Sequence, residues 1–161
     1  MSRWPYVHRR MKLGFSYRFS VAVLWPILHY AVRWDIRDDD VIANSEGGIL
    51  VAANHMSWFD PMVLSYVMWQ ADRPPRFLAK EPLFRAPFVG RIIRGAGQIP
   101  VYRETAEAAA AVRDAVAAVD AGEAVVIYPE GTMTRDPDLW PMSAKTGAAR
   151  IALLTGRPLI P

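Results

Sequence analysis

The amino-acid sequence predicts an α/β fold in which a mixed central sheet is flanked by helices. Two stretches, Ile49–Ala53 and Val125–Ile127, are continuously apolar, as strands covered on both faces of a sheet tend to be. A third stretch, Thr105–Ala121, is rich in alanine and is followed by Gly122, a typical helix stop. Short strands that alternate with helices favour a layered fold with crossover connections.

The predicted elements follow one another without an internal repeat or a linker. The strands expected along the chain are Trp34–Arg37, Ile49–Asn54, Arg76–Lys80, Gln98–Arg103 and Val125–Tyr128, with a sixth beginning at Pro158. The helices expected between them are Pro61–Gln70, Pro87–Arg94, Thr105–Ala121 and Ser143–Leu154. Residues 38–40 and 44–48 are expected to form a polar surface loop. Because the sequence stops inside the sixth predicted strand, we expect the fold to be truncated at its C-terminal end.

Residues 1–32 differ from the rest of the chain in charge and hydropathy. Residues 1–33 contain six basic residues and no acidic residue, and aromatic side chains are frequent among them. The apolar stretch Phe19–Val32 has fourteen residues, interrupted by polar side chains and a proline, whereas a membrane-spanning helix needs about 20 apolar residues. No small-residue cleavage site follows, so a signal peptide is not favoured. The pattern predicts an amphipathic helix lying in the membrane interface, with an ordinary core helix as the alternative.

The composition limits the chemistry of the α/β domain predicted over residues 33–161. The chain of 161 residues has no cysteine, which excludes disulfides, thiolate metal sites and cysteine nucleophiles.

Residues 73–103 carry seven basic residues and one acidic residue, so a second basic segment accompanies the N-terminal one. Two such segments favour an anionic partner, such as lipid headgroups, phosphates or nucleic acid. Nucleic acid is the least favoured of these because the basic segments contain no recognised nucleic-acid-binding motif.

A histidine and an aspartate lie where the first buried strand gives way to a helix. His55 directly follows the strand, and the carboxyl ends of strands are the usual site of chemistry in open α/β sheets. Asp60-Pro61 is typical of a helix start, and the turn before it can bring the Asp60 carboxylate back to the imidazole. A carboxylate on one ring nitrogen leaves the other free to accept a proton, which suits a general base acting on a substrate hydroxyl. Taken alone, the spacing favours a helix cap and a packed histidine, and the catalytic interpretation depends on the segments that accompany it.

Two further segments are expected at the same edge of the sheet. Glu130, Gly131 and Thr132 follow the second buried strand, and amides and hydroxyls there can receive an anion. Arg103 ends another predicted strand, and its planar guanidinium can bind a phosphate through two hydrogen bonds. We therefore expect a cleft in which the imidazole faces the guanidinium and the Glu-Gly-Thr corner.

Together these segments resemble the glycerolipid acyltransferase family, typified by 1-acylglycerol-3-phosphate (lysophosphatidate) acyltransferases. The family's N-H-x-x-x-x-D block is matched by Asn54, His55 and Asp60, and its E-G-T-x-S block by residues 130–134, with Thr134 for the usual serine. The block between them is matched by Phe77, Leu78, Ala79, Lys80, Glu81, Pro87, Gly90, Gly97, Ile99, Pro100, Val101 and Arg103. The resemblance covers roughly residues 33–161 and includes the lysine–glycine pair at Lys145 and Gly147.

The resemblance implies an enzyme that transfers a fatty acyl group from acyl-CoA or acyl-carrier protein to the hydroxyl of a lysophosphatidate-type lipid in phospholipid biosynthesis. It implies that His55 and Asp60 are the catalytic residues. The residues that it implies for substrate binding are Asn54, Lys80, Arg103, Glu130, Gly131 and Thr132. It implies no metal and no cofactor other than the acyl donor as co-substrate, and it makes membrane lipids and that donor the partners.

With its basic and apolar N-terminal helix, such a protein is expected to be peripheral or monotopic on the cytoplasmic face of a membrane. Two alternatives stay open at this point. One is an acyltransferase or transacylase that acts on another lysolipid or on a glycolipid. The other is a non-catalytic module that binds membranes peripherally through its basic segments, in which case the histidine–aspartate pair would do no chemistry.

Overall fold

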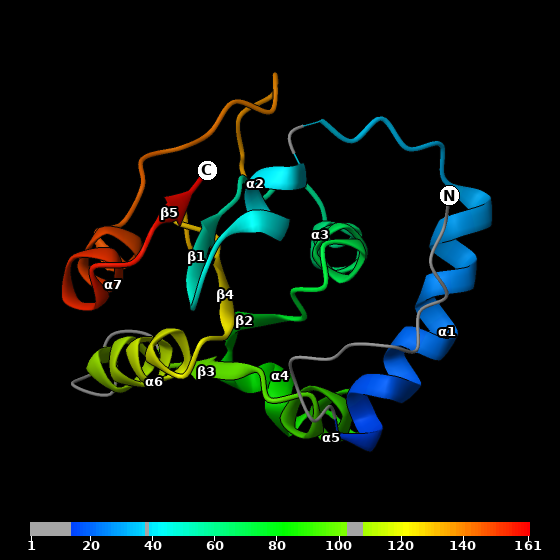
Figure 1. Cartoon of the computed structure of the whole chain (residues 1–161), viewed down its shortest axis with the longest axis horizontal. Coiled ribbons are helices and arrows are strands. Elements are labelled where there is room, and N and C mark those ends of the chain that lie inside the picture. The colour runs from blue at the N-terminus through cyan, green and yellow to red at the C-terminus, as the bar shows by residue number, and fades with distance from the viewer. Residues whose placement is uncertain (1–13, 38, 103–107) are drawn as a thin grey trace.

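The computed structural model describes residues 14–37, 39–102 and 108–161 (Figure 1). Its helices are α1 (Phe15–Ala31), α2 (Asp39–Asn44), α3 (Asp60–Gln70), α4 (Glu81–Arg85), α5 (Val89–Gly95), α6 (Ala108–Asp120) and α7 (Gly147–Thr155). Its strands are β1 (Ile49–Ala52), β2 (Pro75–Lys80), β3 (Ile99–Val101), β4 (Ala124–Ile127) and β5 (Leu159–Ile160). From β1 onward, each strand is separated from the next by at least one helix, as the sequence predicts.

The described strands form one sheet in the order β3-β2-β4-β1-β5, and each adjacent pair is parallel. The adjacent strands β1 and β4 pair Leu50 with Val125 and correspond to the two continuously apolar stretches of the sequence. Parallel strands all end at one edge of a sheet, so the loops that follow β1, β2 and β4 lie close together there. The predicted α/β class, a central sheet flanked by helices, is confirmed, but the described sheet is parallel and not mixed, because a helix separates each strand from the next.

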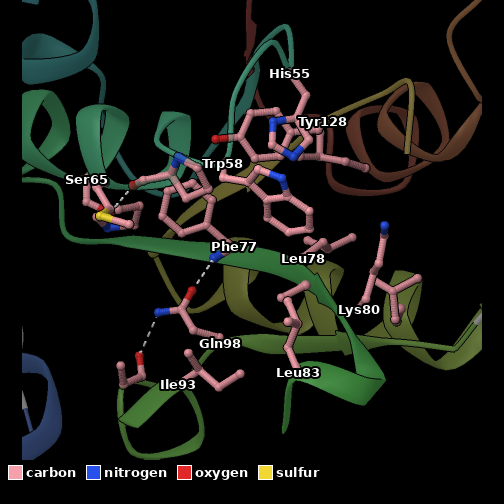
Figure 2. Close-up of a pocket in the computed structure, with 18 of the residues that line it drawn as sticks. His55, Trp58, Ser65, Phe77, Leu78, Lys80, Leu83, Ile93, Gln98 and Tyr128 are labelled. Atoms are coloured by element: carbon pink, nitrogen blue, oxygen red, sulfur yellow. Dashed lines mark hydrogen bonds between the residues drawn. The ribbon is translucent and has the colours of Figure 1, made fainter. Parts of the chain in front are cut away.

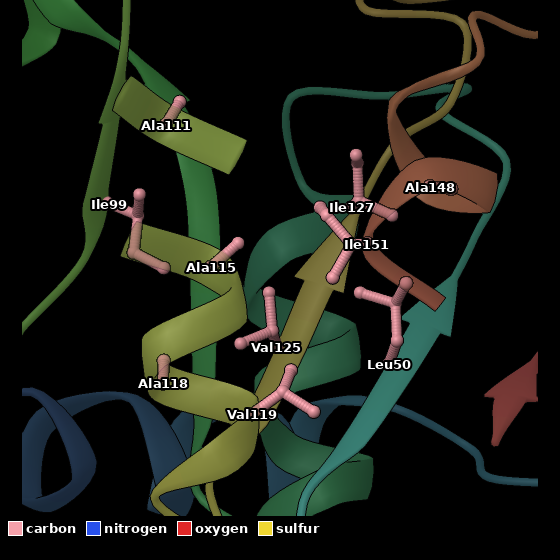
Figure 3. Packing of buried hydrophobic residues seen from close by; sticks show 10 residues of the cluster. All are labelled: Leu50, Ile99, Ala111, Ala115, Ala118, Val119, Val125, Ile127, Ala148 and Ile151. Atoms are coloured by element: carbon pink, nitrogen blue, oxygen red, sulfur yellow. The ribbon is translucent and has the colours of Figure 1, made fainter. Parts of the chain in front are cut away.

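Helices cover both faces of the sheet (Figure 1). On one face α6 and α7 pack on the sheet through small and branched side chains (Figure 3), namely Leu50, Ile99, Ala111, Ala115, Ala118, Val119, Val125, Ile127, Ala148 and Ile151. The core on the other face, which includes α2 and α3, contains Ile42, Ile49, Val51, Met68, Ala71, Phe77, Ala124 and Val126. Successive side chains of a strand point to opposite faces, which is why Leu50 belongs to the first core and Val51 to the second.

Helix α1 lies beside α3 and α5 at the edge of the molecule (Figure 1). Its inner side contributes the buried Leu28 and also Tyr17, whose ring stacks on Trp69 with a centroid distance of 5.7 Å. Its outer side carries large apolar side chains that are exposed at a spacing of three or four residues: Phe15, Phe19, Val23, Ile27 and Tyr30. None of the helices in the described ranges is long and apolar enough to cross a membrane.

The strand predicted at Trp34–Arg37 is wrong. The Trp34 ring instead stacks on Tyr66 with a centroid distance of 4.2 Å, and its Nε1 donates a hydrogen bond to the Leu28 carbonyl oxygen at 3.0 Å. These contacts hold the segment against α1 and α3, away from the sheet, so tertiary packing outweighs the apolar pattern.

Two short helices are additions to the prediction. Helix α2 occupies part of the expected polar loop because Ile42 is buried in the core beside α3. Helix α4 directly follows β2, and an ion pair of 2.6 Å between Arg85 and Glu81, one turn apart, accompanies it. The predicted strand end at Arg103 and the predicted helix start at Thr105 lie outside the described residues.

The contact of Gly48 with α6 gives a prediction about stability. A methyl group at Gly48 would overlap the carbonyl oxygen of Val119 in the last turn of α6. We expect Gly48→Ala to lower the free energy of unfolding by about 1–3 kcal/mol, because overpacking forces backbone to move. Urea denaturation measures the difference. The matched control is Gly147→Ala, whose added carbon would lie at an ordinary 3.7 Å from Ile127; equal midpoints for the two variants would contradict the packing described here.

Candidate active site

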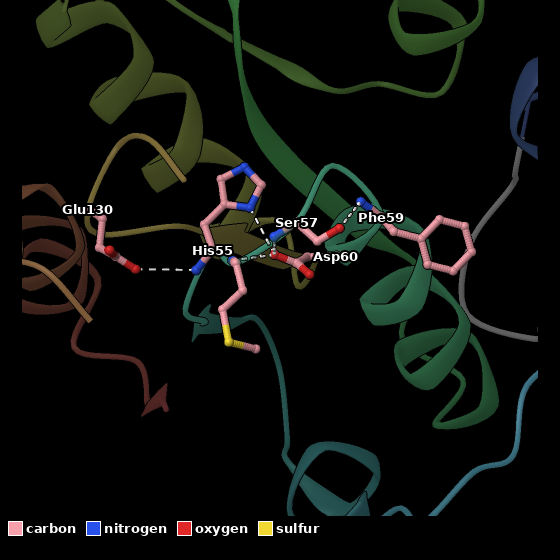
Figure 4. A network of polar contacts seen from close by, with 6 residues as sticks. His55, Ser57, Phe59, Asp60 and Glu130 are labelled. Atoms are coloured by element: carbon pink, nitrogen blue, oxygen red, sulfur yellow. Dashed lines mark hydrogen bonds and ion pairs between the residues drawn. The ribbon is translucent and has the colours of Figure 1, made fainter. Parts of the chain in front are cut away.

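The side chains of His55 and Asp60 meet across the turn that joins β1 to α3 (Figure 4). One carboxylate oxygen, Asp60 Oδ2, lies 3.0 Å from His55 Nδ1 and accepts the backbone N–H groups of Met56 at 2.6 Å and Ser57 at 2.7 Å. Pro61 fits the first turn of α3, and Asp60 places its negative charge at the positive end of that helix. A carboxylate on Nδ1 fixes the proton there, so Nε2 is left as the proton acceptor. The predicted contact between imidazole and carboxylate is present.

The loop after β4 holds the backbone of His55 from the other side (Figure 4). Glu130 is buried, with 6% of its surface exposed, and its Oε1 accepts the His55 backbone N–H at 3.2 Å. Its Oε2 accepts the N–H of Met142 at 3.0 Å. The N–H of Thr134 donates to the His55 carbonyl oxygen at 2.7 Å. Both polar groups of the His55 peptide are therefore bonded to the Glu-Gly-Thr loop, although the two segments are far apart in the sequence.

Tyr128 packs against the imidazole of His55, a contact that was not predicted from the sequence. Its ring stacks on the His55 ring with a centroid distance of 4.2 Å and an interplanar angle of 20°. Phe77 stacks on Tyr128 in turn, at 6.2 Å and 17°. The only signal in the sequence is that Tyr128 ends a buried run immediately before the loop that contains Glu130.

The Tyr128 hydroxyl is buried and has no hydrogen-bond partner within the described part of the chain. Burial, and secondly the negative charge of Asp60, raises the pKa of Tyr128 above its usual value of 10. The phenol is therefore neutral throughout the pH range in which an imidazole titrates. It presents an uncharged aromatic face to His55 and adds no negative charge to the site.

His55 lines a cavity of about 950 Å³ that runs along the carboxyl edge of the sheet (Figure 2). Apolar and aromatic side chains dominate its walls, and α1, α3 and α5 supply many of them, among others Tyr17, Leu24, Trp25, Met62, Tyr66, Trp69, Val89 and Ile93. Three cationic side chains, Lys80, Lys145 and Arg150, also line the cavity. The contribution of α1 was not predicted, because the sequence alone does not place this helix against the sheet edge.

The predicted substrate-binding residues divide into four groups. Lys80, Gly131 and Thr132 line the same cavity as His55. Asn54 is exposed, and it is not among the residues that line this cavity in the described part of the chain. Glu130 binds the two backbone amides named above instead of lining the cavity. Arg103 lies outside the described residues.

A close approach at Gly131 explains why a glycine follows the glutamate. Its φ is +70°, in the left-handed region, and its N–H donates to the Tyr128 carbonyl oxygen at 2.9 Å. A Cβ at this position would lie 3.1 Å from Lys145 Nζ, so the lysine side chain crosses directly over the turn. The ammonium is thereby held at the wall of the cavity that contains the imidazole.

Comparisons with known proteins find acyltransferases similar to this chain. The chain is 32% identical to 1-acyl-sn-glycerol-3-phosphate acyltransferase from Borreliella burgdorferi over 117 residues, which are 72% of this chain and 45% of that protein. It is 26% identical to the enzyme of the same name from Bacillus subtilis, over 73% of this chain and 55% of that protein. The crystal structure of the 1-acyl-sn-glycerophosphate acyltransferase from Thermotoga maritima matches with a TM-score of 0.65 and 25% identity, covering 91% of this chain and 54% of that one.

The chain therefore spans about half the length of the curated relatives that it matches. The family model described as Acyltransferase matches residues 33–161, which include β1 to β5, the turn of His55 and Asp60, and the loop that contains Glu130. Because that match extends over most of the sequence, this chain belongs to the acyltransferase family.

Proposed function

We propose that the protein transfers a fatty acyl group from an acyl thioester, acyl-CoA or acyl-carrier protein, to the free hydroxyl of a lysophosphatidate-type lipid. The observation that carries the proposal is a carboxylate-held imidazole in the wall of a large apolar cavity, with cations in the same wall. Membership of the acyltransferase family and the names of the relatives support the same reaction.

The reaction follows from the free nitrogen of His55. The lipid hydroxyl gives its proton to Nε2 while its oxygen attacks the thioester carbonyl and forms the new C–O bond. Asp60 lies 3.0 Å from Nδ1 and stabilises the imidazolium that results. The tetrahedral intermediate then breaks its C–S bond, and the imidazolium returns the proton to the departing thiolate. A thioester is already activated, so these residues suffice for the proton transfers.

The cations of the cavity suit the acceptor's phosphate. Lys80, Lys145 and Arg150 line the cavity, and Lys145 Nζ lies beside Gly131. Each supplies a positive charge and hydrogen-bond donors that a phosphate oxygen can accept. We propose that these three side chains bind the glycerol phosphate. The resemblance to the family adds Arg103 to this proposal, and that residue lies outside the described part of the chain.

The exposed side of α1 suits an enzyme that collects a lipid from a bilayer. Five large apolar side chains are exposed along this side, and two of them, Phe19 and Val23, also line the cavity. Apolar side chains buried in the headgroup boundary contribute to membrane binding in proportion to their area. We propose that α1 lies in the membrane interface with these side chains in the lipid, so that the lipid substrate enters the cavity from the membrane.

Removal of the base tests the proposed reaction. We expect His55→Ala to lower the turnover of acyl-CoA with lysophosphatidate by about 10²–10⁴, because general-base catalysis typically contributes that much. Thiol release measured against a panel of lysolipids, with acyl-CoA and with acyl-carrier protein, reports both the rate and the preferred pair. Circular dichroism and vesicle binding are the controls and should not change. A His55→Ala chain that released thiol at the parent rate would refute the proposed base.

The stack on Tyr128 gives a second prediction about the same imidazole. A ring face stabilises an adjacent cation by about 1 kcal/mol, which corresponds to about a fivefold change in rate. We expect Tyr128→Leu to lower kcat by that factor, because the imidazolium formed in the reaction loses its stabilisation. Tyr128→Phe keeps the ring and should retain the parent kcat. If Leu and Phe behave alike, the stack has no such role.

The proposed membrane contact of α1 is tested by replacing two of its exposed side chains. We expect the double variant Phe15→Ser and Ile27→Ser to bind anionic lipid vesicles at least tenfold more weakly, because each side chain would otherwise bury apolar area in the lipid. Flotation with vesicles of phosphatidylcholine and phosphatidylglycerol measures the binding. Leu153→Ser, at an exposed apolar position on α7, is the matched control. Unchanged flotation of the double variant would contradict the contact.

A further inference from the structure

The connection between α4 and α5 holds an aromatic side chain in a strained conformation. Phe88 has φ +59° and ψ −63°, and the N–H of Val89 donates to the Pro87 carbonyl oxygen at 2.6 Å. This is the positive-φ form of the γ-turn, which is rare and strained, above all for a bulky residue. Yet Phe88 is 78% exposed, so its ring gains little from packing in the protein. The fold maintains a costly turn that presents an aromatic ring to the outside.

The turn stands at the rim of the cavity. Leu83, before the turn, and Val89, directly after it, both line the cavity, and both are also among the exposed large apolar side chains. Figure 2 shows Leu83 and Ile93 on the α4–α5 side of the cavity, below β2. An exposed apolar group rimmed by polar residues usually marks a surface that binds another apolar body. Here that group, formed by Leu83, Phe88 and Val89, adjoins the opening of an apolar cavity.

The surroundings of the turn are basic. Arg91 lies one helical turn after Phe88, is exposed, and pairs with none of the acidic side chains in the described ranges. Arg85 is exposed on the other side of the turn and forms an ion pair with Glu81 at 2.6 Å. Each basic side chain near an anionic bilayer contributes about fivefold to binding. An apolar tip between exposed arginines is complementary to anionic headgroups above acyl chains.

Helix α5, which begins directly after the turn, packs against α1. At the C-terminal end of α5, a Cβ at Gly95 would overlap the Ser16 side chain, so the start of α1 is in contact with α5. Figure 1 shows the two helices side by side at this end of α1. Phe15, which precedes Ser16 in the chain, is an exposed apolar residue of α1. Two exposed apolar surfaces thus lie on helices that pack against each other.

We propose that the turn around Phe88 is a membrane-insertion site. The Phe88 ring enters the interface of an anionic bilayer and places the rim of the cavity against the lipid. A lysolipid can then move from the bilayer into the cavity without crossing water. The occupant is a bilayer rather than a second copy of the chain, because three exposed apolar residues flanked by cations offer less apolar area than a stable dimer needs. Only the passage of substrate rests on the proposed function; the insertion does not.

The test uses the full chain with Phe88→Gly. Glycine tolerates positive φ, so the variant should unfold at the same urea concentration as the parent or a higher one. We expect its binding to phosphatidylcholine–phosphatidylglycerol vesicles to be about tenfold weaker, because an aromatic ring no longer enters the lipid. Leu153→Ala, at an 84% exposed position on α7, is the matched control and should bind as the parent does. Phe88→Trp should restore binding.

A second pair of measurements separates insertion from catalysis. Phe88→Gly should release thiol at the parent rate with lysophosphatidate in detergent micelles, but several-fold more slowly with the same lipid in vesicles. Vesicle binding equal to that of the parent would overturn the proposal. Loss of a concentration-dependent dimer, with vesicle binding unchanged, would overturn it in favour of a second copy. If the parent released no thiol at all while Phe88→Gly still lost vesicle binding, the insertion would stand and the proposed function would fall.

Discussion

The position of the imidazole depends on one carboxylate oxygen. Asp60 Oδ2 accepts three N–H groups, one from the His55 ring and two from the backbone of the turn that leads to α3. Hydrogen bonds to a charged group contribute about 1.5–3 kcal/mol each, so this one acceptor stabilises the turn as well as the tautomer. Loss of the charge would therefore change the backbone and the chemistry together. For this reason a variant at His55 separates catalysis from folding better than a variant at Asp60 does.

The second constraint is the order of the strands. β1 and β4 are neighbours in the sheet, so the loops that follow them leave the same edge side by side. This proximity lets Glu130 and Thr134 bond to the two sides of the His55 peptide. A buried carboxylate is costly unless it is hydrogen-bonded. One oxygen of Glu130 accepts the N–H of His55, in the loop after β1, and the other accepts the N–H of Met142, in the loop after β4. A residue chosen in the sequence analysis for substrate binding thus serves to hold the imidazole's loop in place.

Local signals in the sequence were enough to predict the elements that build the site. The apolar runs correspond to β1 and β4, and Asp60-Pro61 marks the start of α3, so the contact between His55 and Asp60 could be expected from one turn. Contacts between distant segments could not. The stack of Tyr128 on His55, the partners of Glu130 and the wall supplied by α1 all depend on which strands and helices become neighbours. The error at Trp34 has the same origin, since its partner Tyr66 belongs to another helix.

The core and the cavity meet different physical demands. Under α6 and α7, small side chains such as Ala115 and Ala118 let the helix approach the strands and leave a dense core. The cavity, to which α1 and α3 contribute large rings and α5, α6 and α7 contribute other side chains, has a volume of about 950 Å³. As a closed empty void it would cost on the order of 20 kcal/mol, at about 24 cal/mol per Å³, more than a typical domain's whole stability of about 5–15 kcal/mol. The cavity must therefore be open to water or filled by a ligand, and its apolar walls favour a lipid chain over water.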